Sequence, residues 1–73
     1  TPKEANLLVI LLHNTNKVVD RNLILDELWQ DTDYFSARSM DVYINKIRKY
    51  LKLSDKVKLE NIHGKGFVLH IKP

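Results

Sequence analysis

The stretch RSMDVYINKIRKYL, residues 38–51, places an apolar stripe and a basic, hydrogen-bonding face on opposite sides of one predicted helix. At 3.6 residues per turn, apolar residues spaced i, i+4, i+7 and i+11 share a narrow arc that must face a core, and here they are Met40, Ile44, Ile47 and Leu51. The opposite arc carries Arg38, Val42, Asn45, Lys46 and Lys49. Because an asparagine amide can bond a base edge twice and a valine can contact a thymine methyl group, this face has the chemistry of a DNA-reading helix.

Length and composition indicate one small domain. Its 73 residues can bury only about 60% of the surface that the unfolded chain exposes. The absence of cysteine excludes a disulfide framework and a thiolate zinc site. The longest apolar run, residues 7–12, is too short to span a bilayer, and no signal-peptide pattern is present. We therefore expect a cytoplasmic protein with no membrane partner.

The net charge of +3 is distributed unevenly along the chain. Residues 1–37 carry three Lys and Arg against six Asp and Glu, a net charge of −3, whereas residues 38–73 carry nine against three, a net charge of +6. A cationic second half suits contact with a polyanion, but an ordinary solvated basic face gives the same count, and charge alone favours that simpler explanation.

The first predicted helix has a clear start and an unusual surface. Residues 1–4, TPKE, form a capping box, and we expect the helix to end near Asn14. Leucines fill one of its faces, yet Val9 and Ile10 lie well around the cylinder. Either another element covers Ile10, or this residue is one of the single apolar side chains that surfaces commonly expose.

Two more helices are predicted further along. A short extended segment at residues 18–19 precedes Asp20, which we expect to cap a second helix ending near Trp29. Residues 30–35 are predicted to form a loop, and Ser36 or its neighbour to cap the third helix.

The C-terminal part alternates with the period of a strand. Val57 and Leu59 alternate, Ile62 falls out of phase, and the alternation resumes after residues 63–66, HGKG, in a second strand beginning at Phe67. This pattern predicts a β-hairpin with a bulge, in which both glycines allow positive φ at the tip. Three helices followed by a hairpin describe an α+β winged helix-turn-helix.

Four segments in this order and spacing, TPKEANLL, VVDRNLILDELW, RSMDVYINKIRKYL and NIHGKGFVL, resemble the C-terminal DNA-binding effector domain of OmpR/PhoB-type response regulators. The resemblance covers nearly the whole chain. It implies transcription regulation in a two-component phosphorelay, with double-stranded DNA, commonly in direct repeats, as the partner. It also implies that residues 1–73 are one domain of a longer protein, preceded by a four-stranded sheet, which could cover Ile10, and by a receiver domain.

The resemblance also implies roles for individual residues. Those at phosphate-gripping positions are Trp29, Arg38, Ser39, Arg48, Lys49 and Phe67. Those facing base edges or grooves are Asp41, Val42, Asn45 and Lys46, with His63 and Lys65 at the hairpin tip, which enters the minor groove. The family uses the loop before the third helix to contact RNA polymerase, here Asp31, Asp33 and Tyr34.

Some of these positions depart from the family or have a simpler explanation. His63 stands where arginine is usual, so minor-groove insertion should be weaker because a neutral imidazole lacks a fixed charge. Asn45 and Lys46 also replace frequent arginines. Asp41 would repel phosphate, so we favour a role in helix charge compensation or in orienting Arg38 or Arg48.

No enzymatic function is indicated. The three histidines lack metal-ligand spacing, no serine lies in a nucleophile elbow, and the GKG of residues 64–66 lacks the strand-to-helix context of a phosphate loop, so we expect no cofactor. The remaining alternative is a winged helix that binds an acidic protein partner, against which the polar outer face of residues 38–49 argues.

Overall fold

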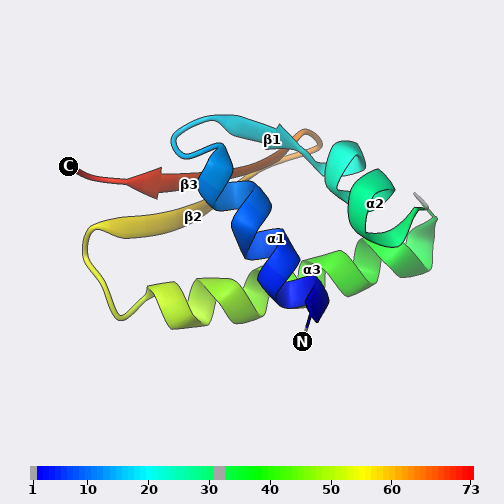
Figure 1. Ribbon diagram of the computed structural model, residues 1–73, viewed down its shortest axis with the longest axis horizontal. Helices are drawn as coiled ribbons and strands as arrows, with labels where there is room; N and C mark the ends of the chain where they lie inside the picture. Colours follow the sequence, from blue (N-terminus) through cyan, green and yellow to red (C-terminus); the bar gives the residue numbers. More distant parts are fainter. Residues whose placement is uncertain (1, 31–32) are drawn as a thin grey trace.

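The computed structural model describes residues 2–30 and 33–73 of the chain. Its elements are α1 (Pro2–His13), β1 (Val18–Asp20), α2 (Arg21–Trp29), α3 (Tyr34–Leu51), β2 (Val57–Ile62) and β3 (Gly66–Ile71). A small sheet lies on one side of the three helices, and α1 crosses α3 in the view of Figure 1. This arrangement confirms the predicted winged helix-turn-helix.

The boundaries of α1 and α2 agree closely with the prediction. Helix α1 ends at His13, one residue before the expected end, while Thr1 of the expected capping box lies outside the described residues. Asp20 caps α2 as predicted, since its Oδ1 accepts hydrogen bonds from the backbone N–H groups of Asn22 at 2.7 Å and Leu23 at 3.4 Å. Gln30, with φ of 56°, ends α2 in the left-handed conformation.

The start of α3 corrects the prediction. The helix begins at Tyr34, so the expected loop of residues 30–35 is shorter, and Ser36 is not the N-cap. Asp33 is the cap, because its Oδ1 accepts from the Ser36 N–H at 2.8 Å. A carboxylate suits this position through both the hydrogen bond and its attraction to the positive end of the helix.

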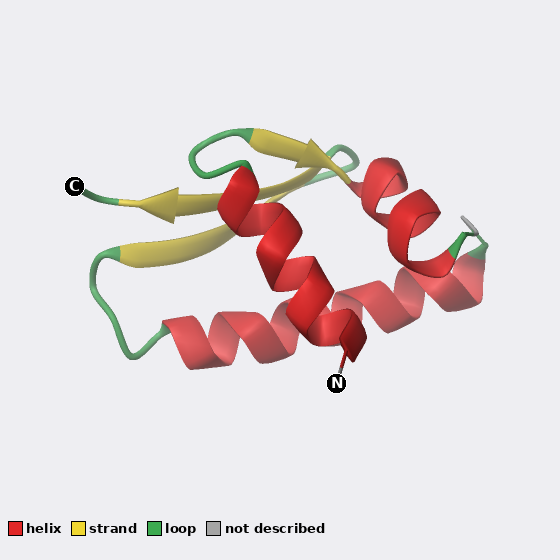
Figure 2. Ribbon diagram, viewed as in Figure 1, coloured by secondary structure: helices red, strands yellow, loops and turns green. Residues whose placement is uncertain are grey.

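The sheet has three strands rather than the two of a simple hairpin. Its order is β1-β3-β2, and both pairs are antiparallel (Figure 2). Strand β2 pairs with β3 without interruption from Val57↔Ile71 to Ile62↔Gly66, so the predicted bulge is absent from this ladder. Strand β3 is central in the sheet, and its residues from Gly66 to Leu69 are buried. Phe67 and Leu69 belong to the core, and Val68 alternates to the opposite face of the sheet.

The two glycines of the hairpin have different roles, which also corrects the prediction. Gly64 has φ of +72° and forms the tip, where the Lys65 N–H donates to the Ile62 carbonyl at 2.9 Å. Gly66 has no positive φ. A Cβ added to Gly66 would lie 1.9 Å from the Val19 carbonyl oxygen, so this glycine permits the close approach of β1 to β3.

One hydrophobic core joins all three helices to the sheet. The buried residues that form it are Leu7, Leu11, Val19, Ile24, Leu25, Met40, Ile44, Ile47, Leu59, Phe67 and Leu69. The predicted inner stripe of α3 is confirmed, although Leu51 is only half-buried. Ile10 packs partly against this core, whereas Val9 and Leu12 are 47% and 46% exposed.

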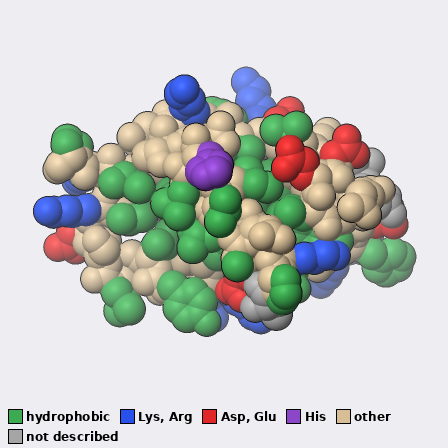
Figure 3. All heavy atoms as spheres, viewed as in Figure 1, with side chains coloured by type: hydrophobic (Ala, Val, Ile, Leu, Met, Phe, Trp, Pro, Cys, Tyr) green, Lys and Arg blue, Asp and Glu red, His purple; other side chains and the backbone are tan. Residues whose placement is uncertain are grey.

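Apolar side chains are exposed on the face of the molecule that α1 crosses. Figure 3 shows hydrophobic side chains spread over the face that α1 crosses, with most Lys, Arg, Asp and Glu side chains around its rim. An apolar groove of about 240 Å³ runs between α1 and α3 there, lined by Ala5, Leu8, Ile47, Tyr50 and Leu51 together with Glu4. No helix in the described part of the chain is long and apolar enough to cross a membrane.

Candidate nucleic-acid interface

The outer face of α3 is fixed by the burial of its inner face. With Met40, Ile44 and Ile47 in the core, the opposite side of the 18-residue helix is presented to solvent. The predicted contact residues that are exposed on it are Arg38, Asp41, Val42, Asn45, Lys46 and Lys49. Ser39 and Arg48 are half-buried at its margins. The structure therefore brings the predicted α3 residues together on one surface.

Arg48 links the outer face of α3 to the wing. Its Nε–H donates to the Leu59 carbonyl of β2 at 3.3 Å, and its Nη1 donates to the Asn45 Oδ1 at 3.0 Å. The second bond orients the Asn45 amide, whose NH₂ group and remaining oxygen lone pair are still available to a base edge. Three of the five guanidinium N–H donors also remain for a phosphate.

Asp41 is paired with a residue that the sequence analysis did not select. Its Oδ1 lies 3.8 Å from a terminal nitrogen of Arg21, the first residue of α2. Arg48, by contrast, bonds Leu59 and Asn45. The expected compensation of helix charge is wrong, because α3 begins at Tyr34 and Asp41 lies in its third turn. The arginine that Asp41 faces is Arg21, not Arg48.

Arg21 also anchors the wing, since its backbone N–H donates to the Lys65 carbonyl at 2.9 Å. Its side chain is 26% exposed and faces Asp41 of α3. Sequence reasoning missed Arg21 because nothing in its immediate neighbours distinguishes it from any charged residue at a helix start.

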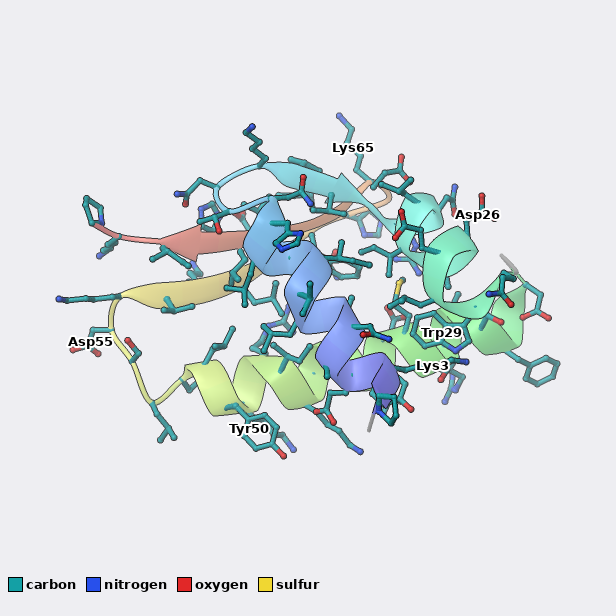
Figure 4. All side chains as sticks on the ribbon, in the orientation of Figure 1. Lys3, Asp26, Trp29, Tyr50, Asp55 and Lys65 are labelled. Carbon is teal, nitrogen blue, oxygen red and sulfur yellow. The ribbon has the colours of Figure 1, made fainter. Side chains whose placement is uncertain are left out.

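The wing tip presents His63 and Lys65 to solvent, as predicted. Figure 4 shows Lys65 extending away from the body of the domain. Phe67, predicted to line the DNA backbone, is instead fully buried at 0% exposure. Its assignment is corrected from a contact residue to a core residue, because its side chain belongs to the core that residues of the three helices also form.

Trp29, which was predicted to contact phosphate, is half-buried against the core, and its ring centroid lies 5.8 Å from that of Tyr43.

The loop predicted to contact RNA polymerase lies only partly within the described residues. Asp31 lies outside the described residues, Asp33 is the N-cap of α3, and Tyr34 is the first residue of that helix. Phe35, next to them, is 79% exposed, a feature that the sequence analysis did not select.

The described surface shows no arrangement suited to metal chemistry. Within residues 2–30 and 33–73, no group of three His, Asp or Glu side chains is placed to hold a metal ion. What this surface offers is a set of hydrogen-bond donors and cations on α3 beside a positively charged wing tip, which is a geometry for binding a polyanion in its groove.

Comparison with known proteins agrees with this geometry. The family described as "Transcriptional regulatory protein, C terminal" matches residues 1–69. The chain is similar to the transcriptional regulatory protein RprY of Bacteroides fragilis, at 49% identity over 69 residues, covering 94% of this chain and 29% of RprY. It is 37% identical over 70 residues to the response regulator ArlR of Staphylococcus epidermidis, covering 94% of this chain and 32% of ArlR. The chain thus spans less than a third of the length of these relatives.

Proposed function

Since the chain belongs to the family of C-terminal domains of transcriptional regulatory proteins, we propose that it binds specific sequences of duplex DNA through α3 and the wing. The observation that carries this proposal is the exposed face of α3, where cations and an oriented amide lie together beside the wing. A helix of about 27 Å with such a face suits the major groove, and the wing tip suits the adjacent minor groove.

The contacts divide into two groups. The residues proposed to position the domain on phosphates are Trp29, Arg38, Ser39, Arg48 and Lys49, joined by Arg21. The residues proposed to read the grooves are Val42, Asn45 and Lys46 on α3, with His63 and Lys65 at the wing. Phosphate contacts carry no sequence information, whereas base-edge contacts do, so the two groups should respond differently to mutation.

A salt series tests the proposal. Affinity for a random-sequence duplex and for a duplex selected by the protein is measured from low to moderate salt. If roughly six phosphates are neutralised, the slope of log affinity against log salt should be near −5. A slope near zero on both duplexes would contradict DNA binding. Capture of an acidic protein that excess duplex does not displace would favour the alternative of a protein-interaction module.

The rest of the protein's role is proposed from its relatives. ArlR is named as a response regulator, and we propose that this chain is likewise the output domain of such a regulator, following an upstream receiver domain. Binding to direct repeats and contact with RNA polymerase through the region of Asp31, Asp33 and Tyr34 belong to the same proposal. Exposed Phe35 supplies an apolar side chain in that region.

The apolar groove between α1 and α3 has a place in this proposal. The four-stranded sheet expected upstream would cover it, together with the exposed Val9 and Leu12. Exposed apolar area of this kind commonly marks a contact surface. A chain extended upstream by the length of that sheet should therefore unfold at a higher temperature than residues 1–73 alone, and an unchanged Tm would contradict this assignment.

A further inference from the structure

A pair of aromatic rings connects the first turn of α1 to the outer face of α3. The Lys3 ammonium lies 5.0 Å from the centroid of the Trp29 ring, the Trp29 and Tyr43 rings are 5.8 Å apart and inclined at 38°, and the Lys46 ammonium lies 5.9 Å from the Tyr43 ring. Through these contacts, Lys3 of α1, Trp29 of α2 and Tyr43 of α3 form a continuous row of side chains. Figure 4 shows Lys3 and Trp29 side by side next to α3.

The aromatic pair lies on the flank of α3 opposite the wing. Arg48 and its bond to Leu59 mark the wing flank, whereas Tyr43 projects from the other side of the helix, toward α1 and α2. A helix inserted in the major groove has a phosphate backbone on each side, and the groove is about 12 Å wide. The flank that carries Trp29 and Lys3 therefore faces the second backbone.

Lys3 keeps its charge available. Among the described residues, no carboxylate lies within 4.0 Å of its ammonium. A ring face attracts the ammonium without neutralising it. It also restricts the motion of a long side chain, so less conformational entropy is lost when the ammonium meets an anion.

From these observations we propose that Lys3 is a further DNA contact, held by Trp29 against the phosphate backbone on the α1 side of α3. This inference rests on the proposed DNA binding and adds to it a contact from α1. The Trp29 ring then both packs against the core and positions a cation, and Lys3 contributes affinity but no sequence preference.

The test compares two charge-removing variants of residues 1–73. In Lys3→Gln, the negative slope of log affinity against log salt should become shallower by about 0.9, the value for one phosphate contact. Lys17→Gln is the matched control, since Lys17 is an exposed lysine beyond the other end of α1, about 18 Å along the helix. It should leave the slope unchanged, and Lys3→Arg should restore the wild-type value.

Further measurements separate this role from others. The ratio of affinities for selected and random duplexes should be the same in Lys3→Gln and wild type. The Tm should fall by no more than about 8 °C, because Lys3 is exposed and a cation–π contact there is worth about 0.5–1 kcal/mol. An unchanged salt slope in Lys3→Gln would overturn the inference while leaving DNA binding intact, and so would an equal effect of Lys17→Gln or a changed affinity ratio. A wild-type slope near zero would instead overturn the proposed function itself.

Discussion

Replacing Gly66 with alanine should separate β1 from β3. The new Cβ would lie 1.9 Å from the Val19 carbonyl oxygen and 2.8 Å from the carbonyl carbon, and these are backbone atoms that cannot rotate away. The strands must move apart by more than about 1 Å to restore ordinary contact. Such a shift weakens ladder hydrogen bonds worth about 1 kcal/mol each and part of the burial of Val19, worth about 1.5–3 kcal/mol when complete.

We therefore expect Gly66→Ala to lower the free energy of unfolding by about 3 kcal/mol. At about 4–8 °C per kcal/mol for a domain of this size, the Tm should fall by roughly 12–24 °C. Thermal and urea unfolding, followed by circular dichroism and by the fluorescence of Trp29, would measure both quantities.

Gly64→Asn is the control, because a Cβ there meets no atom within 4 Å and asparagine tolerates the positive φ of +72°. Its cost should stay below about 1 kcal/mol. If Gly66→Ala unfolded within about 0.5 kcal/mol of the wild type, the close approach of the two strands would not have the structural role assigned to it.

Three further changes test the helix cap and the contact groups. Asp33→Ala removes the N-cap of α3 and should cost about 1 kcal/mol, measured as a drop in Tm of roughly 4–8 °C; an unchanged Tm would contradict the capping role. His63→Arg places a fixed charge at the wing tip and should steepen the salt slope by about 0.9, because a tip in the minor groove lies between the two phosphate backbones. An unchanged slope would contradict the placement of residue 63 in that groove. Lys46→Ala should relax sequence preference by about 1–3 kcal/mol, whereas Lys49→Ala should weaken binding to all sequences alike. An equal loss of sequence preference in both variants would refute the division into groove-reading and phosphate contacts.

Much of this fold follows from local patterns in the sequence. The stripe at Met40, Ile44 and Ile47 predicted both the third helix and the direction of its outer face, because a single period determines which residues share a side. Asp20 was identified as a cap from its type and place. Asp33 has the same residue type, but the apolar stripe that predicts the third helix begins only at Met40, so it does not determine where the helix starts.

The errors concern contacts between distant segments. The third strand of the sheet was missed because the three residues at positions 18–20 carry too short a pattern to predict a partner strand. The burial of Phe67 comes from packing in a core to which the helices and strands all contribute, which a local pattern does not reveal. At the candidate interface, Arg48 also makes a contact with a distant segment that the sequence did not predict. Its bond to the Leu59 carbonyl spans 11 positions and involves a backbone atom, which no side-chain pattern indicates.

The junction of β1 and α2 has a consequence for how the domain meets DNA. Asp20 ends the strand and Arg21 begins the helix, with no residue between them, and the Arg21 N–H bonds the wing at Lys65. The wing therefore cannot rotate relative to α2 without breaking this bond. The helix-turn-helix and the wing move as one rigid unit, in which the distance between α3 and the wing tip is fixed. In the proposed complex, a target whose major- and minor-groove segments do not match that span would have to bend or change its groove width, so the stiffness of the DNA between the two contacts would affect target selection.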